Sequence, residues 1–521
     1  MMTAHLYIAD GIRTASGGGG NALLVGDGLV AAIGRWDELR GSAPETVYQG
    51  CWLLPGLRDA HIHPVAYAAT LRGATLAGAR NFAELTTRLG DAAGKAEGAV
   101  IGMRLNEETL AERRLPDRHI LDRAVADRAV LVHRYCGHVA IANTAALHRA
   151  GIGTDSPDPP GGLIDRGENG EPTGVLRETA IELVAERLGD SNQVSADELL
   201  DGLHRMAAVG ITSIGAILRT GAGAWASLGN EVEIACTASA RMPIKVGTYV
   251  IEEAAPTVAT TKTLIDAAAE RLRWLGIKRF GDGSFGGHTA AMHEPYVDVP
   301  TTGTLRLTDL DREITEASIA LGGGAAIHAI GDAACGAVID MFEELTARGV
   351  DPARLRIEHA SVLTEPDIAR LARSGAIAVV QPPFLGSEAN WLGSRLGDER
   401  LRRTYAFASL ERAGITLAGS SDSPVEPPDP WAGMALARDR AGMVMEERLS
   451  AERALAMYTS GAAKALGEPE PLDVGTPADF IVVDRDPFAV TPAELRETGV
   501  VATYVDGQPL AVDRDKPLWL D

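Results

Sequence analysis

His61 and His63, one residue apart in the run from Leu54 to Pro64, are the residues of this chain best suited to chemistry. Alternate side chains of a strand share a face, so Asp59, His61 and His63 are expected to point the same way. Two imidazoles side by side at the end of a strand can bind one metal ion. A histidine pair that merely caps a strand is the alternative, so the metal site is a hypothesis that needs support from other residues.

The region from residue 53 onwards predicts the strands that would position such a site. Strand patterns alternate with helical stretches, which indicates βα units around a parallel sheet. The predicted strands cover residues 53–63, 210–216, 244–250, 276–281, 325–328, 355–359, 377–381 and 415–422, with helices such as 313–321, 333–348 and 365–374 between them. Eight such units predict an α/β fold, a (β/α)₈ barrel of the TIM type, with its chemistry at the carboxyl ends of the strands.

Further candidate ligands lie at these same strand ends. His328 ends the fifth predicted strand, His359 the sixth and Asp422 the eighth, while Lys278 lies within the fourth. The position of these residues, more than their type, favours one shared metal site. The predicted metal ligands are His61, His63, Lys278, His328, His359 and Asp422.

Lys278 is one of only six lysines among 49 basic residues. A lysine amine that loses its proton in a site of low dielectric can take up CO₂ and form a carbamate, which can bridge two cations, whereas arginine cannot. A carbamylated Lys278 is therefore one interpretation. An ion pair with Asp282 or another neighbour is the alternative.

The rest of the chain divides around the barrel. Short strand patterns at both ends predict a small β-sandwich domain formed by residues 1–54 and 470–521, with the barrel over 55–469. Residues from about 67 to 205 are too many for one βα connection, and we expect an insertion after the first barrel strand. Such an insertion would lie over the mouth of the barrel, where loops carry specificity.

Composition narrows the class of protein. The formal net charge of −22 and pI of about 5.0 argue against nucleic acid or an anionic membrane surface as a partner, and favour a small neutral or cationic substrate. The four cysteines are widely spaced and form no C-x-x-C, so neither a disulfide framework nor a cysteine zinc site is indicated. No apolar run approaches the roughly 18 residues of a membrane span, and the first residues lack a signal-peptide pattern. We expect a cytoplasmic protein; whether it forms a homodimer is open.

The order H-x-H, Lys, His, His, Asp over eight strands resembles the amidohydrolase superfamily. Several motifs resemble the branch called amidohydrolase family 3, which contains the N-substituted formamide deformylases. These motifs include Phe280-Gly-Asp-Gly-Ser284, His328-Ala-Ile-Gly-Asp332, Arg356-Ile-Glu-His-Ala360, Gln381-Pro382 and Gly419-Ser-Ser-Asp-Ser-Pro424. The resemblance covers nearly the whole chain.

The resemblance implies a metal-dependent hydrolase that cleaves a non-peptide C–N bond with water activated by one or two divalent ions, zinc being the expected metal. An N-acyl or N-formyl amine is the leading substrate class. It also implies that Asp422 is the general base, which passes the water proton to the leaving amine. Asp59 could orient an imidazole or form a strand-end turn or cap. For Asp332, we expect capping of the following helix.

Four residues are candidates for contact with substrate. His138, in the insertion, matches a family position, whereas His288 stands where relatives often carry a basic or small residue. Phe384 and Trp391 could wall an apolar pocket. Ordinary loop packing explains each of the four equally well.

Two other functions stay open. A deaminase or a hydrolase of cyclic amides or imines in the same superfamily would work with one metal ion and would not need Lys278. A non-catalytic regulatory member would be expected to lose ligands, whereas this chain keeps them all.

Overall fold

A computed structural model describes residues 4–519 except 16, 18, 72, 96–97, 136, 189–192 and 221–229. Its centre is an eight-stranded parallel sheet in the order β18-β17-β16-β15-β14-β13-β12-β5. The strands are β5 (Leu57–Ile62), β12 (Ile211–Arg219), β13 (Lys245–Ile251), β14 (Leu272–Phe280), β15 (Gly324–Ala329), β16 (Leu355–His359), β17 (Ile377–Val380) and β18 (Leu417–Gly419). Each predicted barrel strand is present, and the α/β TIM-type fold class is confirmed.

The sheet closes where its last strand meets its first. The backbone N–H of Asp422 donates to the carbonyl of His61 over 2.9 Å, and that of His63 donates to the carbonyl of Ser423 over 2.8 Å. Beneath them, the hydroxyl of Ser421 donates to the Asp59 carboxylate over 2.5 Å. Residues about 360 positions apart in the chain are thereby held side by side.

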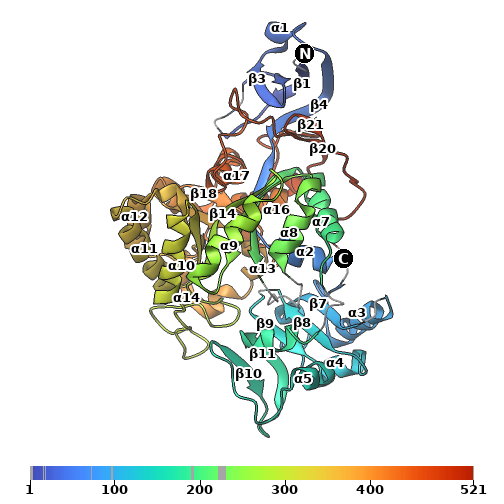
Figure 1. Ribbon diagram of the computed structural model, residues 1–521, viewed down its shortest axis with the longest axis vertical. Coiled ribbons are helices and arrows are strands. Elements are labelled where there is room, and N and C mark those ends of the chain that lie inside the picture. Colours follow the sequence, from blue (N-terminus) through green and yellow to red (C-terminus); the bar gives the residue numbers. More distant parts are fainter. Residues whose placement is uncertain are drawn as a thin grey trace.

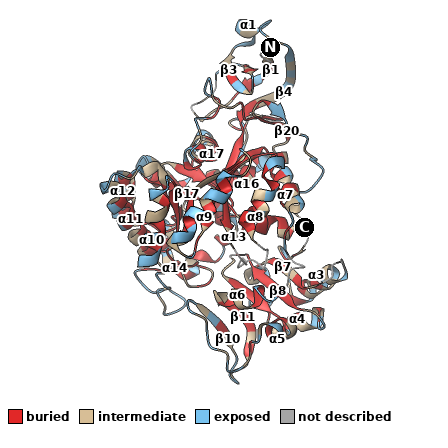
Figure 2. Ribbon diagram, in the orientation of Figure 1, coloured by how far each residue is buried: buried red, intermediate tan, exposed pale blue. Residues whose placement is uncertain are grey.

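Helices surround the barrel, and Figure 2 shows their inner faces buried and their outer faces exposed. The helices packed around it are α2 (Pro64–Thr70), α7 (Ala196–Ala208), α8 (Glu231–Ala238), α9 (Ala255–Asp266), α10 (Asp309–Ala320), α11 (Asp332–Ala347), α12 (Glu365–Ser374), α15 (Phe407–Arg412), α16 (Pro430–Asp439), α17 (Ala451–Tyr458) and α18 (Ser460–Ala465). Two more, α13 (Phe384–Glu388) and α14 (Leu392–Arg402), lie in the long segment after β17. The helices predicted at 313–321, 333–348 and 365–374 correspond to α10, α11 and α12.

The ends of the chain combine in a second sheet, in the order β21-β20-β19-β4-β1-β2-β3. Its elements are β1 (Ala4–Ile12), β2 (Ala22–Gly26), β3 (Leu29–Gly34), α1 (Trp36–Leu39), β4 (Glu45–Pro55), β19 (Phe480–Val483), α19 (Pro492–Leu495), β20 (Val500–Val505) and β21 (Gln508–Pro509). The sheet curls until the N–H of Val30 donates to the carbonyl of Thr476 over 2.9 Å, and Tyr7 meets the rings of Phe480 and Tyr504.

The predicted strand 53–63 is divided between the two sheets. Residues 53–55 belong to β4, which pairs with β1 and β19, and β5 begins at Leu57. Gly56 lies at the crossing, and a Cβ there would come within 2.2 Å of the Thr212 side chain. The predicted strand looks continuous in the sequence, although the chain passes from the terminal sheet to the barrel sheet at Gly56.

The insertion after β5 contains a third sheet, in the order β10-β11-β9-β8-β7-β6. Its elements are β6 (Ala74–Thr75), α3 (Phe82–Lys95), β7 (Val100–Leu105), α4 (Arg118–Ala124), β8 (Val130–Arg134), β9 (Val139–Ala142), α5 (Thr144–Ala150), β10 (Gly162–Arg166), β11 (Pro172–Glu178) and α6 (Ala180–Ala185). The apolar patterns over 99–105 and 129–135 predict β7 and β8, whereas β6, β9, β10 and β11 were not predicted from the sequence. Figure 1 shows this sheet and the terminal sheet at opposite ends of the barrel.

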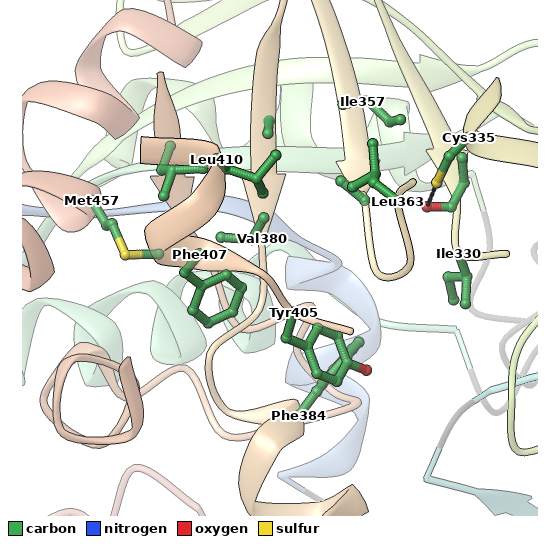
Figure 3. Close-up of a cluster of buried hydrophobic side chains, with 14 of the residues drawn as sticks. Ile330, Cys335, Ile357, Leu363, Val380, Phe384, Tyr405, Phe407, Leu410 and Met457 are labelled. Atoms are coloured by element: carbon green, nitrogen blue, oxygen red, sulfur yellow. Dashed lines mark hydrogen bonds between the residues drawn. The ribbon is translucent and has the colours of Figure 1, made fainter. Parts of the chain in front are cut away.

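The largest cluster of buried apolar side chains lies between the barrel strands and their helices. Figure 3 shows part of it, with Val380 of β17, Phe407 and Leu410 of α15 and Met457 of α17. Such packing fixes the strands whose ends carry the polar residues. In the described part of the chain, no helix has the length and apolarity needed to cross a membrane.

The amino ends of three barrel strands depend on a buried carboxylate, that of Glu468. It accepts from Arg58 of β5 over 2.7 Å, from Ser213 of β12 over 2.5 Å and from Arg273 of β14 over 3.2 Å. Glu468→Gln should lower the free energy of unfolding by about 3–5 kcal/mol, because it leaves the buried Arg58 guanidinium without its counter-charge. Chemical denaturation measures the loss.

The matched control for this prediction is Glu399→Gln. Glu399 has a side chain 93% exposed and lies 3.7 Å from Arg403, so this change should cost less than about 0.5 kcal/mol. Equal stability of the two variants would contradict a structural role for Glu468.

Candidate metal centre

Three residues from three strand ends meet at the carboxyl end of the barrel. The ligand atoms of His61, His359 and Asp422 all lie within 4.8 Å of one another, and all three residues are buried. One oxygen of Asp422, Oδ1, lies 3.2 Å from Nε2 of His61 and 3.3 Å from Nε2 of His63. His63 thus joins the cluster through Asp422.

Two of these residues adopt an unusual backbone conformation. His359 has φ of +73° and Asp422 has φ of +56°, in the left-handed region that L-residues seldom occupy. Each such residue costs on the order of 1–3 kcal/mol and persists when its surroundings impose it. Here the conformation occurs at the points where β16 and β18 give way to loops.

The outer nitrogens of two imidazoles are held by polar partners. Nδ1 of His61 lies 2.5 Å from Oε2 of Glu358, whose carboxylate is also bonded by Arg356. Nδ1 of His359 lies 2.8 Å from Oε1 of Gln381. Partners of this kind fix the ring and the tautomer, which leaves Nε2 available as a ligand. Glu358 and Gln381 were not identified as site residues from the sequence, although both lie in motifs that carry the family resemblance.

Burial and charge set the protonation of the cluster. Burial lowers the pKa of His63, and it lowers the pKa of His359 well below its usual value, which favours the neutral imidazole that binds metals. Burial opposes ionisation of Asp422, but the His61 and His63 rings outweigh it and hold the pKa of this carboxyl well below its ordinary value. His61 differs: burial opposes its charged form, but the Asp422 and Glu358 carboxylates outweigh that effect and raise its pKa. The cluster therefore offers neutral nitrogens from His63 and His359 and an anionic oxygen from Asp422.

His328, at the end of β15, lies beside this cluster. Its ring centre is 4.4 Å from that of His359, while its Nε2 lies 2.8 Å from the carbonyl oxygen of Gly283 and 3.3 Å from Oδ1 of Asp282. Burial lowers the pKa of His328 well below its usual value. His328 is thus neutral and close to the centre, with Nε2 turned toward the loop after β14.

Lys278 of β14 is buried and lines the same cavity as the histidines. Its Nζ lies 3.8 Å from the centre of the Phe280 ring, and no described carboxylate is within ion-pair distance of it. Asp282 instead accepts from the backbone N–H groups of Ala291, Ile330 and Gly331. Burial lowers the pKa of Lys278 to about 8. The alternative of an ion pair with Asp282 is therefore not what the structure contains.

The structure decides between the roles expected for two acidic residues. Asp59 accepts from the backbone N–H of His61 over 3.2 Å, a local bond of the turn type that was one of its two expected roles. It also accepts from the hydroxyl and N–H of Ser421, and so holds β18 against β5. Asp332 is the first residue of α11, whose N-cap is Gly331, and it accepts from the N–H of His293 over 2.9 Å. The expectation that Asp332 caps the helix was wrong, because the capping position falls one residue earlier.

The cluster opens into a cavity of about 370 Å³, to which the insertion contributes one wall. Nδ1 of His138 lies 2.9 Å from Oε2 of Glu178, and this oxygen also accepts from Arg306 over 3.1 Å. Burial opposes ionisation of Glu178, but the neighbouring His138 and Arg306 lower its pKa to about 2. A carboxylate thus orients the His138 ring within the cavity.

The other three predicted contact residues differ in position. Phe384 stacks on His359, with ring centres 6.2 Å apart and planes 9° apart. His288 pairs with Asp298 over 2.9 Å, and Trp391 packs under Arg395; neither lines the described cavities beside the cluster. Their contact with substrate stays a prediction that this arrangement does not favour.

The donor set suits a divalent ion, because imidazole nitrogens and a carboxylate oxygen from separate strand ends are the ligands that zinc and similar metals take. A group of three such atoms, with the Nδ1 atoms of both histidines held by Glu358 and Gln381, meets the requirement for a preformed site.

Comparison with known proteins agrees with this arrangement. The putative amidohydrolase YtcJ of Bacillus subtilis is 30% identical, over 97% of both chains. The N-substituted formamide deformylase of Arthrobacter pascens is 27% identical, over 93% of this chain and 94% of that protein. The crystal structure of an uncharacterized metal-dependent hydrolase from Pyrococcus horikoshii OT3 has a TM-score of 0.74 and 26% identity, over 94% of this chain and 99% of that one.

The model of the amidohydrolase family matches residues 49–511, which include the barrel, the insertion and the part of the terminal sheet from the second half of β4 onwards. With its strand-end cluster of histidines and aspartate, the chain belongs to the amidohydrolase family and is a metal-dependent hydrolase.

Proposed function

We propose that this amidohydrolase cleaves the C–N bond of a small N-acyl or N-formyl amine. The observation that carries the proposal is the position of Asp422, whose Oδ1 lies 3.2–3.3 Å from two imidazole nitrogens at the floor of the cavity. A carboxylate held there is close to the metal donors and open to a substrate. The deformylase relative, which acts on N-substituted formamides by its name, supports the substrate class.

The residues proposed to hold the metal are His61, His63, Lys278, His328, His359 and Asp422. Zinc is the proposed metal, as one or two ions. When bound, a divalent ion polarises the substrate carbonyl and makes a water acidic enough to serve as nucleophile at neutral pH.

Asp422 would handle the proton. It takes one proton from the attacking water as the C–O bond forms, and delivers it to the amide nitrogen as the C–N bond breaks. The products are a carboxylic acid and a free amine, so one water is consumed and no other reactant is needed. The low pKa of Asp422 keeps its carboxylate ionised at neutral pH, so it has an oxygen that can accept a proton.

His138 would hold the substrate from the side of the insertion. The Glu178 carboxylate accepts a hydrogen bond from Nδ1 of His138 and so orients the ring, which lines the cavity where a polar group of the substrate would lie. Arg306 keeps Glu178 ionised and in place. This assignment makes His138 a binding residue, in contrast to the metal ligands.

A hydrolase or deaminase that uses one metal is the second candidate. It is favoured by the compactness of the three-residue cluster and by His328, whose Nε2 is turned to the Gly283 carbonyl. The number of metal ions per active chain distinguishes the two candidates.

Asp422→Asn tests the reaction itself. The asparagine keeps the size of the side chain but cannot accept the proton, so kcat for N-acyl amines should fall at least about 10²-fold. The assay measures release of free amine from a panel of N-formyl and N-acetyl amines, ureas, lactams and aminated heterocycles, with metal content determined in parallel. If wild-type enzyme fully loaded with metal releases amine only from the heterocycles, that result contradicts this proposal and favours the deaminase.

Gln381 should affect metal binding through His359. Gln381→Leu removes the acceptor for Nδ1 and should weaken metal affinity about 10–100-fold. Gln381→Glu retains an oxygen at that position and is the matched control. Competition with a chelator measures both, and unchanged affinity in the leucine variant would show that His359 needs no such support.

Variants of Lys278 test whether the enzyme binds one metal ion or two. The proposed carbamate forms when the neutral amine attacks CO₂ and loses one proton, and its negative charge lets two cations approach. Lys278→Ala and Lys278→Arg should both bind fewer metal ions than wild type, because neither can form the carbamate. Metal analysis gives the stoichiometry, and ¹³CO₂ labelling followed by NMR detects the adduct. An unlabelled lysine in fully active enzyme would contradict the carbamate.

A further inference from the structure

A second, much smaller chamber adjoins the candidate metal centre. It has a volume of about 30 Å³, against about 370 Å³ for the main cavity. The residues that line both are His138, His328, His359, Asp422 and Val425. A carbonyl carbon at the cluster would therefore have one substituent facing each chamber.

The walls of the small chamber are mostly apolar. Ile330 follows β15, and Phe384 and Tyr405 come from the segment after β17; all three are buried, and Figure 3 shows Phe384 and Tyr405 beyond the ends of the barrel strands. Two of its polar side chains bond each other, since the Tyr405 hydroxyl donates to Oε2 of Glu388 over 2.5 Å. Phe384, stacked on His359, forms a flat face next to the metal donors.

The main cavity differs in that charged side chains make up a large part of its lining, beside apolar ones such as Ile181 and Ile251. Arg219 pairs with Glu182 over 3.0 Å and with Glu253 over 2.8 Å. Its backbone N–H donates to the carboxylate of Glu231, which also lines the cavity. A polar or cationic substituent can form hydrogen bonds with these side chains in place of those it makes with water. An alkyl group offers them no hydrogen-bond partner.

We propose that the small chamber receives the acyl substituent and limits it to a short chain, while the main cavity receives a polar amine. The inference rests on the proposed function and adds its substrate class: formyl, acetyl and at most propanoyl amides of hydroxylated or cationic amines. About 10–15 Å³ of such space holds one water-sized group, so about 30 Å³ admits roughly two non-hydrogen atoms beyond the carbonyl carbon.

The first test uses metal-loaded enzyme and the N-formyl, N-acetyl, N-propanoyl, N-butanoyl and N-benzoyl derivatives of ethanolamine. We expect kcat/KM for the butanoyl and benzoyl amides to be at least about 100-fold below that for the acetyl amide, since each excess methylene must displace close-packed walls. A parallel series of formamides with larger polar amines should vary less than about tenfold.

The second test enlarges one chamber at a time. Ile330→Ala removes side-chain volume from the small chamber only, and Ile181→Ala, which removes the same atoms from the main cavity, is the matched control. The first should raise the butanoyl-to-acetyl ratio of kcat/KM at least about tenfold, and the second should leave it within about twofold. Ile330→Val, a milder change that preserves the β-branch, should raise the propanoyl-to-acetyl ratio if the alanine variant does not fold.

A binding measurement gives a readout independent of turnover. Calorimetric titration of the metal-loaded protein with acetate and butanoate should give tighter binding of acetate in wild type, and a smaller difference in Ile330→Ala. Turnover without a limit on acyl length, or amides of large acids with ammonia or methylamine as the best substrates, would overturn this inference alone. Full metal loading with no cleavage of any N-acyl amine would overturn the proposed function, and the titration would then still report whether the chamber selects short chains.

Discussion

Closure of the barrel between β5 and β18 is the constraint on which the candidate site depends. The backbone bonds between His61 and Asp422 and between His63 and Ser423 bring the histidine pair next to the carboxylate. Asp59 reinforces this seam through Ser421, which explains why an acidic residue precedes the pair without touching either imidazole side chain. Any distortion that opened the seam would separate Asp422 from both imidazoles, so the geometry of the chemistry is inseparable from that of the fold.

Burial of so many ionisable groups in one place requires that their charges be balanced. His359 and His328 lose their charge because burial lowers the pKa of each, whereas Glu358 and Asp422 keep theirs. Burial opposes ionisation of Glu358, but Arg356 and His61 lower its pKa to about 2. An uncharged imidazole and an ionised carboxylate are the forms that bind a cation.

Much of this could be predicted from the sequence, because the strands repeat a simple pattern and a TIM-type barrel places chemistry at their carboxyl ends. Alternation predicts that Asp59, His61 and His63 share a face, but it fails at β16. Arg356 and Glu358 point to one face, and His359 would then face the opposite way, yet its left-handed backbone turns it to the cluster. Glu358 contacts the imidazole of His61, and Gln381 contacts that of His359. Both contacts depend on how the barrel strands are aligned with one another, which cannot be deduced from the sequence. Four strands of the insertion were missed: β6 and β9 have too few residues to show periodicity, and β10 and β11 border turns rich in glycine and proline.

The insertion connects fold and selectivity. The walls of both chambers combine barrel residues with His138 of the insertion, so neither chamber is complete before the two parts dock. Docking relies on ion pairs across the junction, Arg104 with Glu426 and Arg395 with Glu108, each 3.2 Å long. Such pairs contribute little net stability when solvated but fix orientation when partly buried, as these are. The barrel can therefore keep its metal donors constant, while changes in the docked insertion alter the shape of the space in which the substrate must fit.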